Sequence, residues 1–188
     1  MDAFLTSTGL VALAEIGDKT QLLSLLLAAR FRRPWPIIAG ILVATLANHA
    51  GASALGAWLT TIASPQVLRW GLGLSFIAMA GWMLVPDEAE LGDTDGGRFG
   101  VFGTTLLAFF LAEMGDKTQI ATIALAARFG EFLPVVLGTT AGMMLANVPA
   151  VFIGNGLAQR LPVRLVHGIA AVIFAAIGLA VILGDPLR

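Results

Sequence analysis

The chain has 188 residues, of which 57% are apolar and only 12% are Asp, Glu, Lys or Arg, with a net charge of −1. A soluble domain carries about 25% charged residues, so this chain lacks the charge for a water-facing surface. Its balanced charge also excludes the basic surface with which proteins bind nucleic acid. Cysteine is absent, which excludes disulfides and thiolate metal sites. With only two histidines, a multi-histidine zinc or iron site would be hard to assemble. The composition therefore predicts a protein whose main partner is the lipid bilayer.

Six hydrophobic runs divide the sequence, at residues 3–29, 37–63, 67–85, 101–127, 133–157 and 163–183. Each run is long enough to cross a hydrocarbon core of ~30 Å as a helix. Helix is required because open strands leave backbone groups unsatisfied in lipid. The first residues lack the positive region and cleavage site of a signal peptide, so we expect the first run to remain as a span. We predict an all-α integral membrane fold with six transmembrane helices.

An internal repeat is the strongest feature of the sequence. Residues 13–21, Leu-Ala-Glu-Ile-Gly-Asp-Lys-Thr-Gln, return at 111–119 with Met114 as the single change. The match continues in the Ala-Ala-Arg-Phe segments at 28–31 and 126–129 and in the Leu-Ala-Asn segments at 46–48 and 145–147. We therefore predict two three-helix repeats, residues 1–85 and 101–188, joined by an acidic loop at 86–100. Because three is odd, the repeats should have inverted topology, which is a plan typical of secondary transporters.

The arginines predict an orientation in the membrane. If each run spans the bilayer, one side receives six arginines: Arg30, Arg32, Arg33, Arg98, Arg160 and Arg164. The opposite side receives Arg69, Arg128 and Arg188. The positive-inside rule makes the six-arginine side cytoplasmic. The acidic loop is then cytoplasmic and both termini lie outside.

Ionisable side chains fall near the middle of two predicted spans. Glu15 lies about twelve residues into its run, ~18 Å along a helix, and Glu113 has the same place in the fourth run. A charged side chain at that depth costs ~3 kcal/mol on insertion scales, so a set that occurs twice indicates function. On a helix, Asp18 and Gln21 follow Glu15 along one face of oxygen donors. The predicted metal ligands are Glu15, Asp18, Gln21, Glu113, Asp116 and Gln119.

Other polar and small residues of the two repeats are expected to support this site. The glycines permit close packing or local unwinding, and the lysines partly offset the acids. The threonines point away from the glutamates and should bond backbone or a neighbouring helix. The asparagines complete the cavity or, as is commoner for such residues, bond between helices. These supporting residues are Gly17, Gly115, Lys19, Lys117, Thr20, Thr118, Asn48 and Asn147.

The charge of the predicted site indicates cation exchange. Four convergent carboxylates and two lysines carry a formal charge of −2, which one divalent cation or two protons would balance. Oxygen-only donors suit Ca²⁺, Mn²⁺ or Mg²⁺. Met114 either offers a thioether that favours Mn²⁺ or packs as an ordinary apolar side chain. No cofactor is expected, since the metal ion and the protons are the transported substrates.

Four other interpretations compete with an exchanger. Glu15–Lys19 and Glu113–Lys117 are (i, i+4) pairs and can be structural salt bridges, although this leaves Asp18 and Asp116 unexplained. The same acids can select ions in a cation channel or bind an amino acid for export. A metal-dependent intramembrane enzyme is the poorest fit, because the sequence has no serine nucleophile motif, metal-ligating histidine pair or phosphate loop.

The doubled E-x-G-D-K-T hexapeptide resembles the GDT family of cation/proton exchangers, whose signature is E-x-G-D-[KR]-[ST] and which looks related to the lysine-exporter superfamily. The resemblance covers essentially the whole chain. It implies exchange of Ca²⁺ or Mn²⁺ for H⁺ in a bacterial inner membrane, with Glu15, Asp18, Glu113 and Asp116 binding the cation, and it leaves a homodimer open. Relatives often have an aromatic residue at the position of Met114, so the resemblance leaves the metal preference open.

Overall fold

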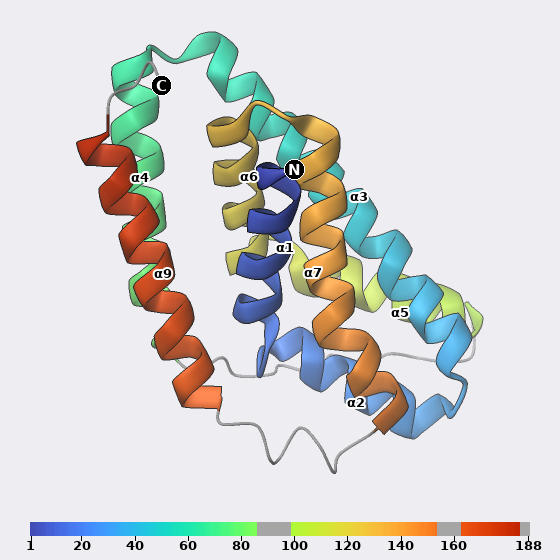
Figure 1. Ribbon diagram of the computed structural model, residues 1–188. Coiled ribbons are helices and arrows are strands. Elements are labelled where there is room, and N and C mark those ends of the chain that lie inside the picture. Colours follow the sequence, from blue (N-terminus) through green and yellow to red (C-terminus); the bar gives the residue numbers. More distant parts are fainter. Residues whose placement is uncertain (86–98, 154–162, 185–188) are drawn as a thin grey trace.

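The computed structural model describes residues 1–85, 99–153 and 163–184, and within them the regular secondary structure is entirely helical (Figure 1). This confirms the predicted all-α class. Most of the predicted acidic loop, at 86–98, lies outside the described residues. The helices are α1 (Asp2–Glu15), α2 (Lys19–Phe31), α3 (Pro34–Ile62), α4 (Pro65–Trp82), α5 (Gly100–Glu113), α6 (Lys117–Phe129), α7 (Phe132–Ile153) and α9 (Val163–Leu183).

The two motif-bearing runs are broken helices. Each of the predicted runs 3–29 and 101–127 divides at its motif, into α1 and α2 and into α5 and α6. Gly17 and Gly115 have φ angles of 83° and 74°, a left-handed conformation that glycine adopts without a Cβ clash. The local unwinding that the sequence analysis allowed at these two glycines is therefore present, and each run consists of two helices rather than one.

In each half of the chain, the third helix packs on the motif helices of the other half. The third helix of the first half, α3, packs on α5 and α6, while the corresponding α7 packs on α1 and α2. Corresponding motif helices also have equal lengths: 14 residues in α1 and α5 and 13 in α2 and α6. Such reciprocal contacts are what a two-fold relation produces. The two helices that carry each motif therefore pack against the third helix of the opposite half.

Glycines permit the close approach of these helices. A Cβ added at Gly56 of α3 would lie 2.3 Å from the Ile123 carbonyl oxygen of α6, and one at Gly138 of α7 would lie 2.5 Å from the Phe4 carbonyl oxygen of α1. Small residues at such crossings let helix backbones pack by van der Waals contact where lipid removes the hydrophobic driving force. The glycines therefore bring α3 and α7 against the motif helices.

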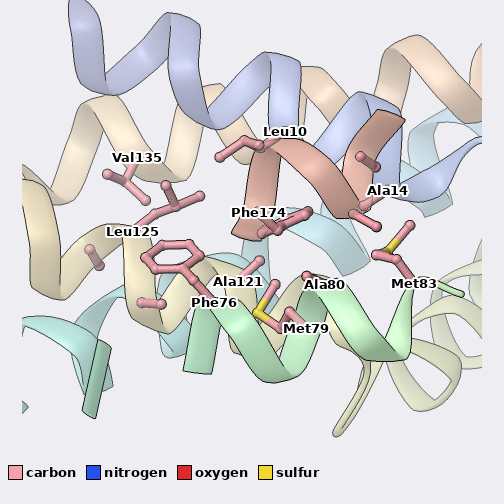
Figure 2. Close-up of a cluster of buried hydrophobic side chains, with 14 of the residues drawn as sticks. Leu10, Ala14, Phe76, Met79, Ala80, Met83, Ala121, Leu125, Val135 and Phe174 are labelled. Carbon is pink, nitrogen blue, oxygen red and sulfur yellow. The ribbon is translucent and has the colours of Figure 1, made fainter. Parts of the chain in front are cut away.

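The remaining helices, α4 and α9, pack on each other beside the other six (Figure 1). Gly73 and Gly178 lie at their crossing, where a Cβ on either would overlap the opposite helix. Phe76 and Phe174 stack with ring centroids 6.1 Å apart. These rings belong to a buried apolar cluster that also includes Leu10 of α1 (Figure 2). The cluster joins the α4–α9 pair to the motif helices.

Helix length is consistent with a membrane protein. Among the described residues, three helical segments are long and apolar enough to cross a bilayer: Pro34–Ile62, Phe132–Phe152 and Arg164–Leu183. The motif helices, with 13 or 14 residues each, reach only ~20 Å singly, so α1 with α2, or α5 with α6, would need to cross as a pair. Trp35 and Trp58 are exposed near the two ends of α3, as expected of interface anchors.

The Gly56 crossing makes a direct prediction about stability. Gly56→Ala forces a backbone clash with α6, and overpacking of this kind costs ~1–3 kcal/mol, so the unfolding temperature in detergent should fall. Gly51→Ala is the matched control on the same helix, because its new Cβ meets nothing within 4 Å. That variant should unfold at the same temperature or higher. Equal losses in the two variants would contradict the packing of α3 on α6.

Candidate metal centre

Three buried carboxylates meet where the two helix breaks come together. Glu15 and Asp18 come from the first break and Asp116 from the second, and one oxygen of each lies within 4.8 Å of the other two. Metal–oxygen bonds to Ca²⁺ are 2.3–2.6 Å long, so two ligands on one ion are at most about 5 Å apart. These three oxygens therefore fit the coordination sphere of a single cation.

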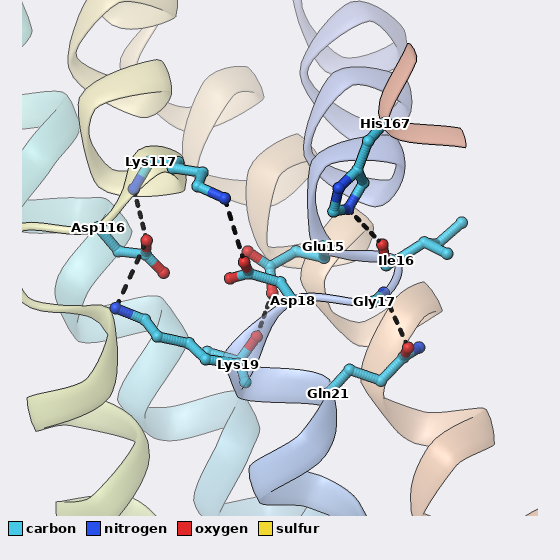
Figure 3. A network of polar contacts seen from close by, with 10 residues as sticks. Glu15, Ile16, Gly17, Asp18, Lys19, Gln21, Asp116, Lys117 and His167 are labelled. Atoms are coloured by element: carbon cyan, nitrogen blue, oxygen red, sulfur yellow. Dashed lines mark hydrogen bonds and ion pairs between the residues drawn. The ribbon is translucent and has the colours of Figure 1, made fainter. Parts of the chain in front are cut away.

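The motif lysines pair across the repeats. Lys117 Nζ lies 3.5 Å from Asp18 Oδ1, and Lys19 Nζ lies 3.5 Å from Asp116 Oδ1 (Figure 3). These pairs differ from the (i, i+4) Glu–Lys pairs of the structural interpretation, because each lysine reaches the aspartate of the other motif. Three carboxylates with two ammonium groups leave one net negative charge. The group is therefore neutralised only in part by the chain itself.

The two ion pairs differ in their access to solvent. The side chain of Lys117 is 2% exposed, whereas that of Lys19 is 30% exposed. Equivalent positions of the repeats thus have unequal surroundings. The carboxylate group is closed on the Lys117 side and more open on the Lys19 side.

The two motif glutamines accept hydrogen bonds from the glycine N–H groups at the helix breaks. Gln21 Oε1 accepts the Gly17 N–H at 2.9 Å, and Gln119 Oε1 accepts the Gly115 N–H at 2.8 Å. Gln21 Nε2 also donates to the Ala146 carbonyl of α7 at 3.0 Å. Each broken helix leaves an N–H without its helical acceptor, and the glutamine supplies one. The predicted ligand role of the two amide oxygens stays a prediction, and in this structure both oxygens are directed to glycine N–H groups.

The threonines of the two motifs behave differently from each other. Thr20 Oγ1 donates to Glu15 Oε2, so the expectation that it points away from the glutamate is wrong. The reason is the break at Gly17, which turns α2 relative to α1. Thr118 is buried, and its hydroxyl has no hydrogen-bond partner among the described residues. Glu15 Oε1 likewise makes no hydrogen bond of standard geometry in the described part of the chain, and Thr118 lies beside this carboxylate.

Glu113 is the predicted acid outside this 4.8 Å group, although it is close enough to interact electrostatically with Glu15 and Asp116. Thr45 Oγ1 donates to its Oε1 at 2.9 Å, and Asn48 Nδ2 donates to its Oε2 at 2.9 Å. Both donors belong to α3, three residues apart, which places them on one helix face. The sequence analysis named Asn48 but missed Thr45. The signal was available, since Thr45 lies one turn before an asparagine already implicated.

Asn147 occupies the position in the repeat that corresponds to Asn48, but it bonds differently. Its Oδ1 accepts the Ser24 hydroxyl at 2.7 Å, and its Nδ2 donates to the Met143 carbonyl at 3.1 Å. It therefore links α7 to α2 without touching a motif acid through these bonds. This is the interhelical role that the sequence analysis gave as one of two alternatives.

Met114 and His49 are two further residues near the motifs, and they differ in burial. Met114 is 56% exposed, which favours the alternative of an ordinary apolar side chain over a thioether ligand. His49 is fully buried on α3, and neither ring nitrogen has a hydrogen-bond partner within the described residues.

Comparison with known proteins identifies the family. The family model described as divalent cation/proton antiporter GDT1 matches residues 3–91 and 101–187. The chain belongs to this family. The resemblance seen in the doubled motif is thereby confirmed, and the family is one of membrane transporters.

Individual relatives cover most of the chain. A Vibrio cholerae protein named "Putative manganese exporter" is 51% identical over 181 residues, covering 96% of this chain and 90% of the relative. GDT1-like protein sll0615 of Synechocystis is 26% identical over 94% of this chain and 96% of its own length. GDT1-like protein 3 of Oryza sativa subsp. indica is 28% identical over 99% of this chain and 75% of its own length. No solved structure gives a significant match to the chain.

The unequal burial of the two lysines predicts unequal mutant stability. Lys117→Met withdraws the ammonium from a buried aspartate, and removal of one partner of a buried ion pair costs ~3–5 kcal/mol. Lys19→Met should cost less, because solvent reaches that side chain and screens the pair. Thermal unfolding of both variants in the same detergent measures the difference. Equal shifts, or a larger shift for Lys19→Met, would contradict the described burial.

Proposed function

We propose that this protein is a secondary transporter that exchanges a divalent cation, Mn²⁺ or Ca²⁺, for protons across a bacterial inner membrane. The observation that carries the proposal is the meeting of Glu15, Asp18 and Asp116 within 4.8 Å of one another. Family membership supports cation/proton antiport. The name of the Vibrio relative makes Mn²⁺ the first ion to test.

The burial of the three carboxylates explains why such a site would always hold either a cation or protons. The three carboxylates are almost fully buried, and the two lysines leave them one net negative charge. A buried charge without a partner is costly, so either a cation or protons must accompany these groups. Loss of a cation then favours proton uptake, and loss of protons favours cation binding. This competition is the coupling that antiport needs.

Glu113 fits the proposal as a carboxylate that takes part in only some steps. With Glu113 included, four carboxylates and two lysines carry −2, the charge that a divalent cation neutralises. In the described arrangement Glu113 is satisfied by Thr45 and Asn48. We propose that Glu113 exchanges these α3 bonds for the cation during the transport cycle.

Alternating access would use the two halves as inverted repeats. In this proposal, residues 1–85 and 101–188 each cross the membrane three times, with α1–α2 and α5–α6 crossing as broken pairs. Broken helices that meet at the membrane midplane are a recurring way to build a substrate site in transporters. The arginine distribution then makes the 86–100 loop cytoplasmic and leaves both termini outside.

The dimensions of the group favour a metal ion over the alternatives. Three oxygens within 4.8 Å suit one small cation better than a zwitterionic amino acid, whose charged ends lie on different atoms. A channel would need the same acids without coupling. Uphill ion movement driven by protons therefore separates the exchanger from the channel.

The first test of this proposal uses neutral substitutions of the aspartates. Asp18→Asn or Asp116→Asn should abolish Mn²⁺ uptake into proteoliposomes under an imposed pH gradient, because each removes a charged oxygen ligand. Glu131→Gln is the matched control, since it removes an exposed acid outside the site and should leave uptake unchanged. Parallel assays with Ca²⁺ and Mg²⁺ rank the ions. Normal uptake in both aspartate variants, or Mn²⁺ movement that the pH gradient does not drive, would refute exchange at this site.

The second test separates Glu113 from the other acids. Glu113→Gln should retain Mn²⁺ binding within about threefold while its exchange rate falls at least about tenfold, a barrier increase of ~1.4 kcal/mol. Asp116→Asn should instead lose binding. Binding to detergent-solubilised protein and flux in proteoliposomes are compared for the two variants. Equal loss of binding in both would show that Glu113 is a permanent ligand.

A further inference from the structure

A histidine of α9 bonds to the first helix break. His167 Nε2 lies 2.7 Å from the carbonyl oxygen of Ile16 (Figure 3). A carbonyl oxygen only accepts hydrogen bonds, so Nε2 must carry the proton and donate it. The side chain of His167 is 9% exposed, which shields this bond from competition with water.

The carbonyl that receives this bond is one that the break has released. Ile16 has an extended backbone, with φ −65° and ψ 114°, so its carbonyl does not continue the hydrogen-bond ladder of α1. A carbonyl that is withdrawn from water without a donor is destabilising, and the bond to Ile16 is partly buried. His167 supplies that donor from a helix that is distant in the sequence.

The position of Ile16 connects this bond to the carboxylates. Ile16 directly follows Glu15 and lies two residues before Asp18, so its peptide orientation helps set where both acidic side chains begin. Gln21 fixes the next peptide through the Gly17 N–H. The first break is therefore held by α2 on one side of Gly17 and by α9 on the other.

The hydrogen bond from His167 differs in kind from the apolar contacts that α9 makes with α1. Farther along α9, Phe174 packs with Leu10 and Ala14 of α1 in the apolar cluster of Figure 2. Apolar packing fixes the distance between two helices but does not specify the orientation of a peptide group. A directed hydrogen bond does specify it.

We infer that His167 is a positioning residue for the cation site: its hydrogen bond to the Ile16 carbonyl sets the first break so that Glu15 and Asp18 face Asp116. The inference rests on the proposed function, since the cation is what these acids would bind. The side chain acts through the backbone of Ile16 and is not itself a ligand. Its loss should therefore weaken cation binding more than it slows turnover.

The test compares two substitutions at His167 in proteoliposomes that take up Mn²⁺ under a fixed pH gradient. His167→Leu keeps bulk but has no donor, and should raise the KM for Mn²⁺ about tenfold, equivalent to ~1.4 kcal/mol, with Vmax changed less than about twofold. His167→Gln retains an N–H donor and should restore KM to within about threefold of the unsubstituted protein. Val172→Leu, at a position 69% exposed on the same helix, is the matched control and should change neither quantity.

Three outcomes would overturn the inference. They are an unchanged KM in His167→Leu, a fall in Vmax and folded protein without a change in KM, and a glutamine variant that behaves like the leucine variant. The second outcome is what a purely structural role produces. Failure of the proposed function is distinguishable from all three, because the unsubstituted protein would then show no Mn²⁺ uptake driven by protons.

Discussion

Every buried backbone group needs a hydrogen-bond partner, and a helix broken inside a membrane protein must supply partners for the groups that the break releases. The first break meets this need with residues of its own motif and of distant helices. The Asp18 N–H returns to the Glu15 carbonyl, the Gly17 N–H goes to Gln21, and the Ile16 carbonyl goes to His167. Gly17 allows the backbone to turn, Gln21 and His167 provide hydrogen-bond partners for the released backbone groups, and Glu15 and Asp18 lie beside the turn. The polar residues of the motif therefore both build the break and furnish the carboxylates.

The carboxylate group belongs to neither half of the chain alone. Lys19 and Lys117 each reach the aspartate of the opposite motif, and Asn48 of the first half donates to Glu113 of the second. The close crossings at Gly56 and Gly138 hold the halves at the distance that these contacts need. Packing between the repeats and the electrostatics of the site consequently depend on the same geometry. A change at either crossing would alter the spacing of the acids even without touching one.

Much of this organisation was predictable from the sequence because it depends on local pattern. Composition indicated a membrane protein, and the repeated nonapeptide indicated two related halves. The depth of Glu15 and Glu113 in their runs pointed to the motif acids, which include all three that meet. Tertiary contacts decided the rest. The sequence gives Glu15 and Glu113 identical neighbours apart from Met114, yet Thr20 bonds Glu15 whereas Thr45 and Asn48 of another helix bond Glu113. Helical angles also placed Thr20 wrongly, because they assume a continuous helix through Gly17.

Equivalent residues of the two repeats differ in exposure and in hydrogen bonding, and this difference bears on the proposed alternating access. If two inverted halves had identical conformations, the site would be equally open to both sides of the membrane, and a transporter must avoid this state. In this structure the equivalent residues differ: Lys19 is partly exposed while Lys117 is buried, and Asn48 bonds an acid while Asn147 bonds Ser24. Under the proposed function, the opposite opening requires the halves to exchange these conformations. Each half contains an asparagine at the corresponding position of its third helix, so the amide donor is present in both halves. The hydroxyl of Thr45 is not, because Met144 stands at the corresponding position. Since the lysines also pair across the halves, the carboxylates would keep their counter-charges while that change takes place.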